Sequence, residues 1–120
     1  MQKESFNITN KTKSTPEGVP FALIKNAVLG KKYSLSLVFI NAVESRKINF
    51  AYRKKDKPTN VLSFPLDKNC GEIFICPEIA KKEGLSVGFL FIHGLLHLKG
   101  MEHGSTMEKA EDKLRKKFGI

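Results

Sequence analysis

The sequence predicts an α+β protein, a small mixed β-sheet of about four strands packed with helices. Two observations lead to this class. Segments with the two-residue period of strands and segments with helical periodicity mix along the chain without strict alternation. The 120 residues, of which 41% are hydrophobic, suit one compact core. We therefore expect a single domain over residues 1–120.

Four segments are predicted to be strands. Residues 33–40 are the clearest, because Tyr33, Leu35, Leu37 and Phe39 alternate with the other residues. Residues 61–64 form a second strand, which Pro65 is expected to stop. Residues 72–76 form the returning strand, and residues 6–10 form a short edge strand.

The first half of the chain also contains two predicted helices. One covers residues 16–29, and its expected apolar side consists of Val19, Leu23 and Ala27. The other covers residues 41–52, and its candidate core positions are Val43, Ile48 and Ala51. A polar loop over residues 53–60 follows.

Three further helices are predicted in the second half. Pro77 opens a short helix that ends near Glu83, and Ser86 caps a longer helix that runs to Leu98. The last helix is expected to begin with a capping box, Ser105-Thr106-Met107-Glu108. Its buried side is predicted to consist of Met107, Ala110, Leu114 and Phe118.

All three histidines of the chain fall within eleven residues, at His93, His97 and His103. On a helix, residues four apart project from the same side, so His93 and His97 should be neighbours. Gly100 allows the chain to leave the helix and bring His103 back toward them. Three imidazoles with one open position form a catalytic zinc site. We therefore predict a metal site on a central buried helix and its following turn.

The helix that carries these histidines has no charged residue between Ser86 and Leu98. A buried imidazole needs partners for both ring nitrogens, and each unsatisfied group costs about 1–3 kcal/mol. Zinc peptidases place Glu directly after the first histidine as the general base, but that position here is Gly94. Glu102 is the only carboxylate within the motif, and it is a candidate for orienting a ligand or the reacting water.

The charge of the chain favours a polyanionic partner. There are 21 Lys and Arg against 12 Asp and Glu, which gives a net charge of +9. Neither a signal peptide nor an apolar run of membrane-spanning length is evident. Cys70 and Cys76 flank a predicted strand too long for a disulfide, so they are expected to be free thiols in the cytoplasm.

Three ordered motifs resemble a known family, the YbeY-like endoribonucleases, which are bacterial ribosomal-RNA maturation factors. The run from His93 to His103 is similar to the family signature. Residues 53–65 resemble the family's arginine loop and following strand, and residues 71–76 resemble its next strand. The resemblance covers about residues 35–118. The chain departs from the family pattern at Met101-Glu102, where Tyr-Asp or His-Asp is usual, and at Asn60, where Asp is usual.

The resemblance implies a single-strand-specific, metal-dependent endoribonuclease that matures the 3′ end of small-subunit ribosomal RNA and acts in ribosome quality control. It implies zinc (or another divalent transition metal) on His93, His97 and His103, with ribosomal RNA and the ribosome as partners and no membrane. Arg53 is expected to stabilise charge on the phosphate, with Glu102 as a second catalytic candidate. Two alternatives are a zinc metallopeptidase-like hydrolase and a non-catalytic ribosome-binding metal protein.

Overall fold

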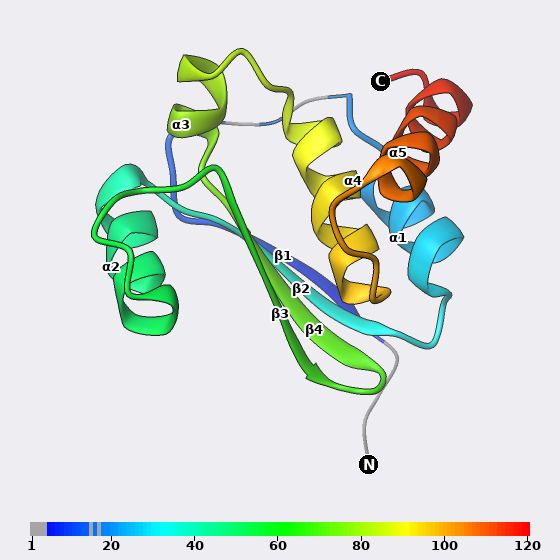
Figure 1. Cartoon of the computed structure of the whole chain (residues 1–120), viewed down its shortest axis with the longest axis horizontal. Helices are drawn as coiled ribbons and strands as arrows, with labels where there is room; N and C mark the ends of the chain where they lie inside the picture. Colours follow the sequence, from blue (N-terminus) through cyan, green and yellow to red (C-terminus); the bar gives the residue numbers. More distant parts are fainter. Residues whose placement is uncertain (1–4, 15, 17) are drawn as a thin grey trace.

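The computed structural model describes residues 5–14, 16 and 18–120. Over these residues the chain forms four strands and five helices (Figure 1). In chain order they are β1 (Phe6–Asn10), α1 (Phe21–Leu29), β2 (Ser34–Phe39), α2 (Ala42–Arg53), β3 (Val61–Asp67), β4 (Cys70–Ile75), α3 (Pro77–Lys82), α4 (Val87–Leu98) and α5 (Ser105–Phe118).

The four strands form one mixed sheet in the order β1-β2-β4-β3. β1 and β4 both pair in parallel with β2, whereas β3 pairs antiparallel with β4 through a tight hairpin. The predicted α+β class and the predicted mixed sheet are therefore confirmed. β3 is an edge strand, so only one of its two edges is paired with another strand, and it borders the cavity described below.

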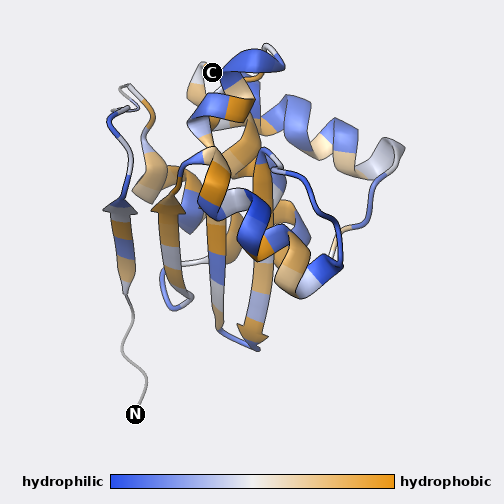
Figure 2. Ribbon diagram, turned by 90° about the vertical axis from the view of Figure 1, so that its left-hand side faces the viewer, coloured by the Kyte–Doolittle hydropathy of each residue, from blue (hydrophilic) through white to orange (hydrophobic). Residues whose placement is uncertain are grey.

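Alternating side chains of the central strands face two different apolar clusters. In β2, Leu35, Leu37 and Phe39 join the larger cluster, which includes residues of α1, α4 and α5. Val38 and Ile40 belong to a smaller cluster on the opposite face, with Ile48 of α2 packed against it. α1, α4 and α5 thus lie on one face of the sheet and α2 lies on the other (Figure 1). The strands are largely hydrophobic, whereas the outlying loops are largely polar (Figure 2).

Helix α4 is the centre of the larger cluster. Ser86 caps it as predicted, because its hydroxyl accepts a hydrogen bond from the backbone N–H of Phe89 at 3.1 Å. Gly94 lets the helix lie directly on the sheet. A Cβ at this position would lie 2.8 Å from Ser63 Oγ and 3.1 Å from Ile73 Cδ1. Because the helix lies this close, the Ser63 hydroxyl donates a hydrogen bond to the Gly94 carbonyl at 3.1 Å.

Two helix predictions are only partly correct about which side chains enter the core: for the first helix, Val19 packs against the larger cluster, but Leu23 and Ala27 are exposed. α1 begins at Phe21 and not at residue 16, because Pro20 disfavours helical geometry in the residue before it. Its buried side is formed by Phe21, Ile24 and Val28, and Leu23 is 64% exposed. Position 17, which the predicted helix included, lies outside the described residues.

The predicted core side of α2 is correct only at Ile48. Val43 is 65% exposed and Ala51 is also exposed, whereas Ser45 and Asn49 are fully buried. The reason is that a polar loop, and not an apolar surface, packs on this side of the helix.

One predicted strand end and one predicted helix cap also differ from the structure. Pro65 does not stop β3, which continues to Asp67, because a proline lacking its N–H is tolerated in an edge strand. The capping box of α5 does not form: Gly104 occupies the N-cap position and makes no side-chain bond. The predicted inner side of α5 is confirmed, with Met107 buried and Ala110, Leu114 and Phe118 packed against the core.

The contact at Gly94 yields a stability prediction. Gly94→Ala should lower the free energy of unfolding by about 1–3 kcal/mol, because the new methyl group overpacks the α4–sheet contact. Denaturation in urea measures the change. Gly88→Ala on the same helix is the matched control: there the nearest neighbour is the flexible end of Ile120, so Ala should be neutral or stabilising. Equal losses in the two variants would contradict the proposed packing constraint.

Candidate active site

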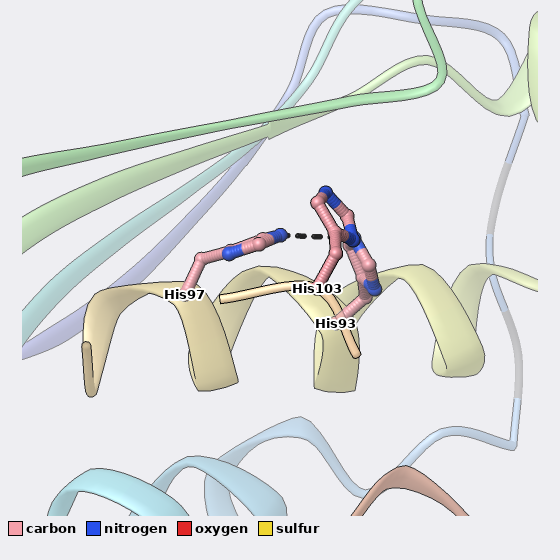
Figure 3. A group of neighbouring side chains, drawn as sticks. All are labelled: His93, His97 and His103. Carbon is pink, nitrogen blue, oxygen red and sulfur yellow. Dashed lines mark hydrogen bonds between the residues drawn. The ribbon is translucent and has the colours of Figure 1, made fainter. Parts of the chain in front are cut away.

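The three histidine side chains converge on one point (Figure 3). His93 and His97 project from the same side of α4, and their Nε2 atoms lie 3.1 Å apart. His103 returns to them because the chain turns at Gly100, which has φ +102°. Its ring centroid lies 4.6 Å from that of His97 and 5.1 Å from that of His93. The ligand atoms of all three side chains lie within 4.8 Å of one another.

Hydrogen bonds behind the rings fix which nitrogen of each imidazole faces the centre. His93 Nδ1 donates to the carboxylate of Glu111 at 2.7 Å, and His97 Nδ1 donates to the Met101 carbonyl at 2.9 Å. In the neutral rings both Nε2 atoms then carry a lone pair, and these lone pairs face each other. Two facing lone pairs repel unless a cation lies between them.

The spacing fits a metal ion. A tetrahedral zinc ion with Zn–N bonds of about 2.0–2.1 Å places two ligand nitrogens about 3.3 Å apart. The observed 3.1 Å between His93 and His97 is close to this value. The hydrogen bond from His93 to a carboxylate is also the usual support of a histidine that binds a metal. The three residues together could therefore hold a metal ion.

His97 is tuned toward the neutral form that binds metals. Burial lowers the pKa of this imidazole, and the neighbouring His93 and His103 lower it further. The hydrogen bond to the Met101 carbonyl and the charge of Glu111 act in the opposite direction without reversing the shift. The His97 ring is consequently uncharged at neutral pH.

The histidines line one end of an open cavity of about 570 Å³. Arg53, the last residue of α2, lines the same cavity from the other side of β3. Segments that are 40 residues apart in sequence, around positions 53 and 93, therefore meet at one site. The remaining lining residues are Thr59, Asn60, Val61 and Ser63.

The loop that follows Arg53 is held against α2 by polar contacts. Lys54 takes a left-handed conformation with φ 60°, which turns the chain back along the helix. Ser45 Oγ donates to the Thr59 carbonyl at 2.8 Å and accepts from the Thr59 N–H at 2.9 Å. Asn49 Nδ2 donates to the Lys57 carbonyl at 2.8 Å. The buried polar residues of α2 thus set the position of the cavity wall that contains Arg53 and Thr59.

Two carboxylates near the site, those of Glu102 and Glu111, lie in different surroundings. Glu102 is exposed in the turn before α5 and is not among the residues that line the cavity. Glu111, which the sequence analysis missed, is only 6% exposed and holds His93. A signal for Glu111 was present, because it falls on the side of α5 that contains Met107 and Leu114. A charged residue on a buried side needs a partner.

A hydrogen bond to a nearby side chain explains why Asn60 stands where the family usually has Asp. Its side-chain amide donates to the carboxylate of Glu83 at 2.8 Å. An Asp at this position would place two carboxylates against each other. Asn60, the residue before β3, therefore ties this part of the cavity lining to the end of α3.

Gly94 argues against a peptidase. In zinc peptidases the residue after the first histidine is the catalytic Glu. Here a Cβ at that position would already lie 2.8 Å from Ser63 Oγ and 3.1 Å from Ile73 Cδ1, so the contact with the sheet leaves little room for a larger side chain. The chain therefore lacks the general base of a zinc peptidase at this position.

Cys70 and Cys76 are free thiols, as expected, and neither belongs to the histidine cluster. Among the described residues, no helix has both the length and the hydrophobicity needed to cross a membrane.

Fold and site together define the class: an α+β protein with an open three-histidine site beside an arginine. Comparison with known proteins makes the class specific. A family model described as endoribonuclease YbeY matches residues 1–119. The endoribonuclease YbeY of Ehrlichia canis is 37% identical over 137 residues, which cover 98% of this chain and 89% of that protein. The endoribonuclease YbeY of Buchnera aphidicola is 34% identical over 125 residues, covering 85% and 81%.

The chain belongs to the endoribonuclease YbeY family. This confirms the predicted family and the predicted enzyme class. The solution structure of TM1509 from Thermotoga maritima matches with a TM-score of 0.64 and 23% identity, covering 94% of this chain and 88% of that one. At this identity the likeness supports the fold alone.

The lowered pKa of His97 predicts how the metal-free protein responds to pH. The unfolded chain protonates His97 near the ordinary pKa of 6.5, whereas the folded protein does so only at lower pH. The free energy of unfolding should therefore fall as the pH drops below about 6.5. Urea denaturation between pH 7.5 and 5.5 measures the slope. His97→Gln removes this contribution, so its profile should be flatter; parallel profiles would contradict the assignment.

Proposed function

We propose that the protein is a zinc-dependent endoribonuclease that cleaves single-stranded RNA in the cavity between the three histidines and Arg53. The observation that supports this most directly is the pair of Nε2 atoms that face each other at 3.1 Å, with Arg53 lining the same cavity. The family to which the chain belongs supplies the class of substrate.

In this proposal His93, His97 and His103 hold the zinc ion and leave one position open. When bound, zinc would supply a lowered pKa for a water molecule and polarisation of a phosphoryl oxygen. Glu111 positions His93, and the Met101 carbonyl positions His97, so that both rings keep their Nε2 atoms toward the centre. Three histidines favour zinc among the divalent metals.

Arg53 is the proposed phosphate ligand. Its guanidinium is permanently charged and can donate two parallel hydrogen bonds to the phosphate oxygens. Held at the cavity wall, it stabilises negative charge as the phosphodiester reacts. Thr59 and Ser63 line the cavity between Arg53 and the histidines. We do not include Glu102 in this set, because its exposed side chain does not line the cavity.

The proposed substrate is ribosomal RNA, with maturation of the 3′ end of small-subunit RNA and ribosome quality control as the roles. The net charge of +9 favours binding to a phosphate backbone. We place the activity in the cytoplasm, where ribosomes lie and where free thiols such as Cys70 and Cys76 stay reduced.

Glu111 provides a test of the metal site that does not depend on RNA. Glu111→Ala should weaken zinc affinity by about 10- to 100-fold, because His93 loses the carboxylate that orients it. Competition with a chromophoric chelator measures the affinity. Glu108→Ala on the exposed side of the same helix is the matched control and should bind zinc normally. If the two variants bind zinc equally well, Glu111 does not support the site.

One cleavage experiment separates the roles of His97 and Arg53. His97→Ala should lose both bound zinc and cleavage of a defined single-stranded RNA. Arg53→Ala should keep its zinc and lose about 10²–10³-fold in kcat, since one donor to the reacting phosphate is gone. Lys55→Ala, in the same exposed loop, is the control and should change kcat little. Full-rate cleavage by a folded Arg53→Ala variant would overturn its role, and cleavage by zinc-free His97→Ala would overturn the metal mechanism.

A further inference from the structure

A second hollow lies on the other side of β3 from the histidine cavity. We call it the aromatic hollow; it is formed by Ile48, Tyr52, Phe64, Leu66, Glu72 and Phe74, with a volume of about 330 Å³. The Tyr52 and Phe64 ring centroids lie 5.2 Å apart, and those of Phe64 and Phe74 lie 5.9 Å apart. Tyr52 is 72% exposed and Leu66 is 58% exposed. A cluster of apolar groups left open to water marks an interaction surface.

The aromatic hollow is adjacent to the proposed catalytic cavity through two pairs of sequence neighbours. Ser63 lines the cavity, and Phe64, the next residue of β3, lines the hollow, because successive strand residues point to opposite faces. Arg53 lines the cavity, and Tyr52, which precedes it in α2, lines the hollow. A chain that crosses the exposed edge strand β3 therefore passes from one to the other.

The surrounding charge identifies the chemistry of that chain. Arg53, Lys54, Lys55 and Lys57 are all exposed beside Tyr52. The only acidic residue among them, Asp56, is paired with Arg46 at 2.7 Å, so the loop stays strongly positive. A positive path beside exposed aromatic rings is how proteins bind single-stranded nucleic acid: cations follow the phosphates and the bases stack on the rings.

The composition of the hollow favours a base over a phosphate. Glu72 lines it, and a carboxylate repels phosphate but accepts hydrogen bonds from the amino group on a base edge, such as that of cytosine. The rings supply the stacking surface. A double-stranded RNA could not use the hollow, because its bases are already stacked within the helix.

We propose that the aromatic hollow is a base-binding subsite, in which one unpaired base of the RNA stacks on Tyr52 and Phe64 while a neighbouring phosphate lies at Arg53. This rests on the proposed endoribonuclease function and deepens it. The subsite selects single-stranded RNA, and it sets the distance from the held base to the bond that is cut.

The test combines a protein variant with a modified substrate. Zinc-loaded Tyr52→Ala should raise the KM for a short single-stranded RNA by roughly 5- to 100-fold with kcat nearly unchanged, because stacking contributes binding and no chemistry. Tyr52→Phe keeps the ring and should restore the wild-type KM. Phe50→Ala is the matched control, since Phe50 is an aromatic residue of the same helix, 52% exposed, that does not line the hollow.

Abasic nucleotides placed one at a time around the cleaved bond then identify the base. At one of these positions, loss of the base should raise the KM of the wild-type protein as much as Tyr52→Ala does. The same abasic RNA should not raise the KM of the Tyr52→Ala variant any further. Equal KM for wild type and Tyr52→Ala, or additive effects at every position, would overturn the subsite. Sedimentation of both proteins adds a third readout: a wild-type dimer that becomes monomeric in Tyr52→Ala would assign the hollow to a second copy and overturn base binding.

The result also separates this inference from the function on which it rests. If the wild-type protein cleaves the RNA while Tyr52→Ala has an unchanged KM, the subsite fails and the endoribonuclease stands. If zinc-loaded wild-type protein neither binds nor cleaves single-stranded RNA, the proposed function fails together with the subsite.

Discussion

The close approach of α4 to the sheet at Gly94 is the constraint on which the site depends. Without a side chain at this position, the helix backbone lies against Ser63 and Ile73, and the Gly94 carbonyl accepts a hydrogen bond from β3. The same contact sets the rotation of the helix about its axis. With Gly94 turned to the sheet, His93 and His97 point into the space beside edge strand β3. The close contact that excludes a bulky residue at position 94 thus also fixes how the histidines of α4 are presented.

Around this contact the cavity is assembled from two walls of different chemistry. One wall is α4 with the turn to α5, in which apolar packing holds the helix and Glu111 holds His93 from behind. The other is the end of α2 with its loop, which supplies Arg53 and is fixed by Ser45 and Asn49. The histidine wall provides imidazole nitrogens that could hold a metal ion, and the arginine wall provides permanent positive charge. In the proposed function, a phosphodiester held between the two walls would meet both groups, and both can stabilise charge during hydrolysis.

The sequence alone predicted those features that depend on residues close to one another in the chain. The two-residue alternation of residues 33–40 identified β2, and the spacing of His93 and His97 predicted their convergence. The failures have a common origin in tertiary structure. The buried side of α2 is polar because a loop packs on it, and periodicity of apolar residues cannot reveal that. Glu111 was missed because its partner lies on another helix, 18 positions earlier. The position of Arg53 at the cavity depends on how α2 packs relative to α4, and the local sequence pattern does not reveal the packing of two distant segments.

The polar attachment of α2 has a consequence for motion. The fully buried side chains of this helix are Ser45 and Asn49, and the side-chain oxygen of Asn49 is buried without a hydrogen-bond partner among the described residues. α4, by contrast, is anchored by large apolar side chains such as Leu90, Phe91 and Leu95. Segments held by few apolar contacts open locally at a lower free energy than the core. Local opening of the arginine wall should therefore cost less free energy than local opening of the histidine wall, which large apolar side chains hold in place.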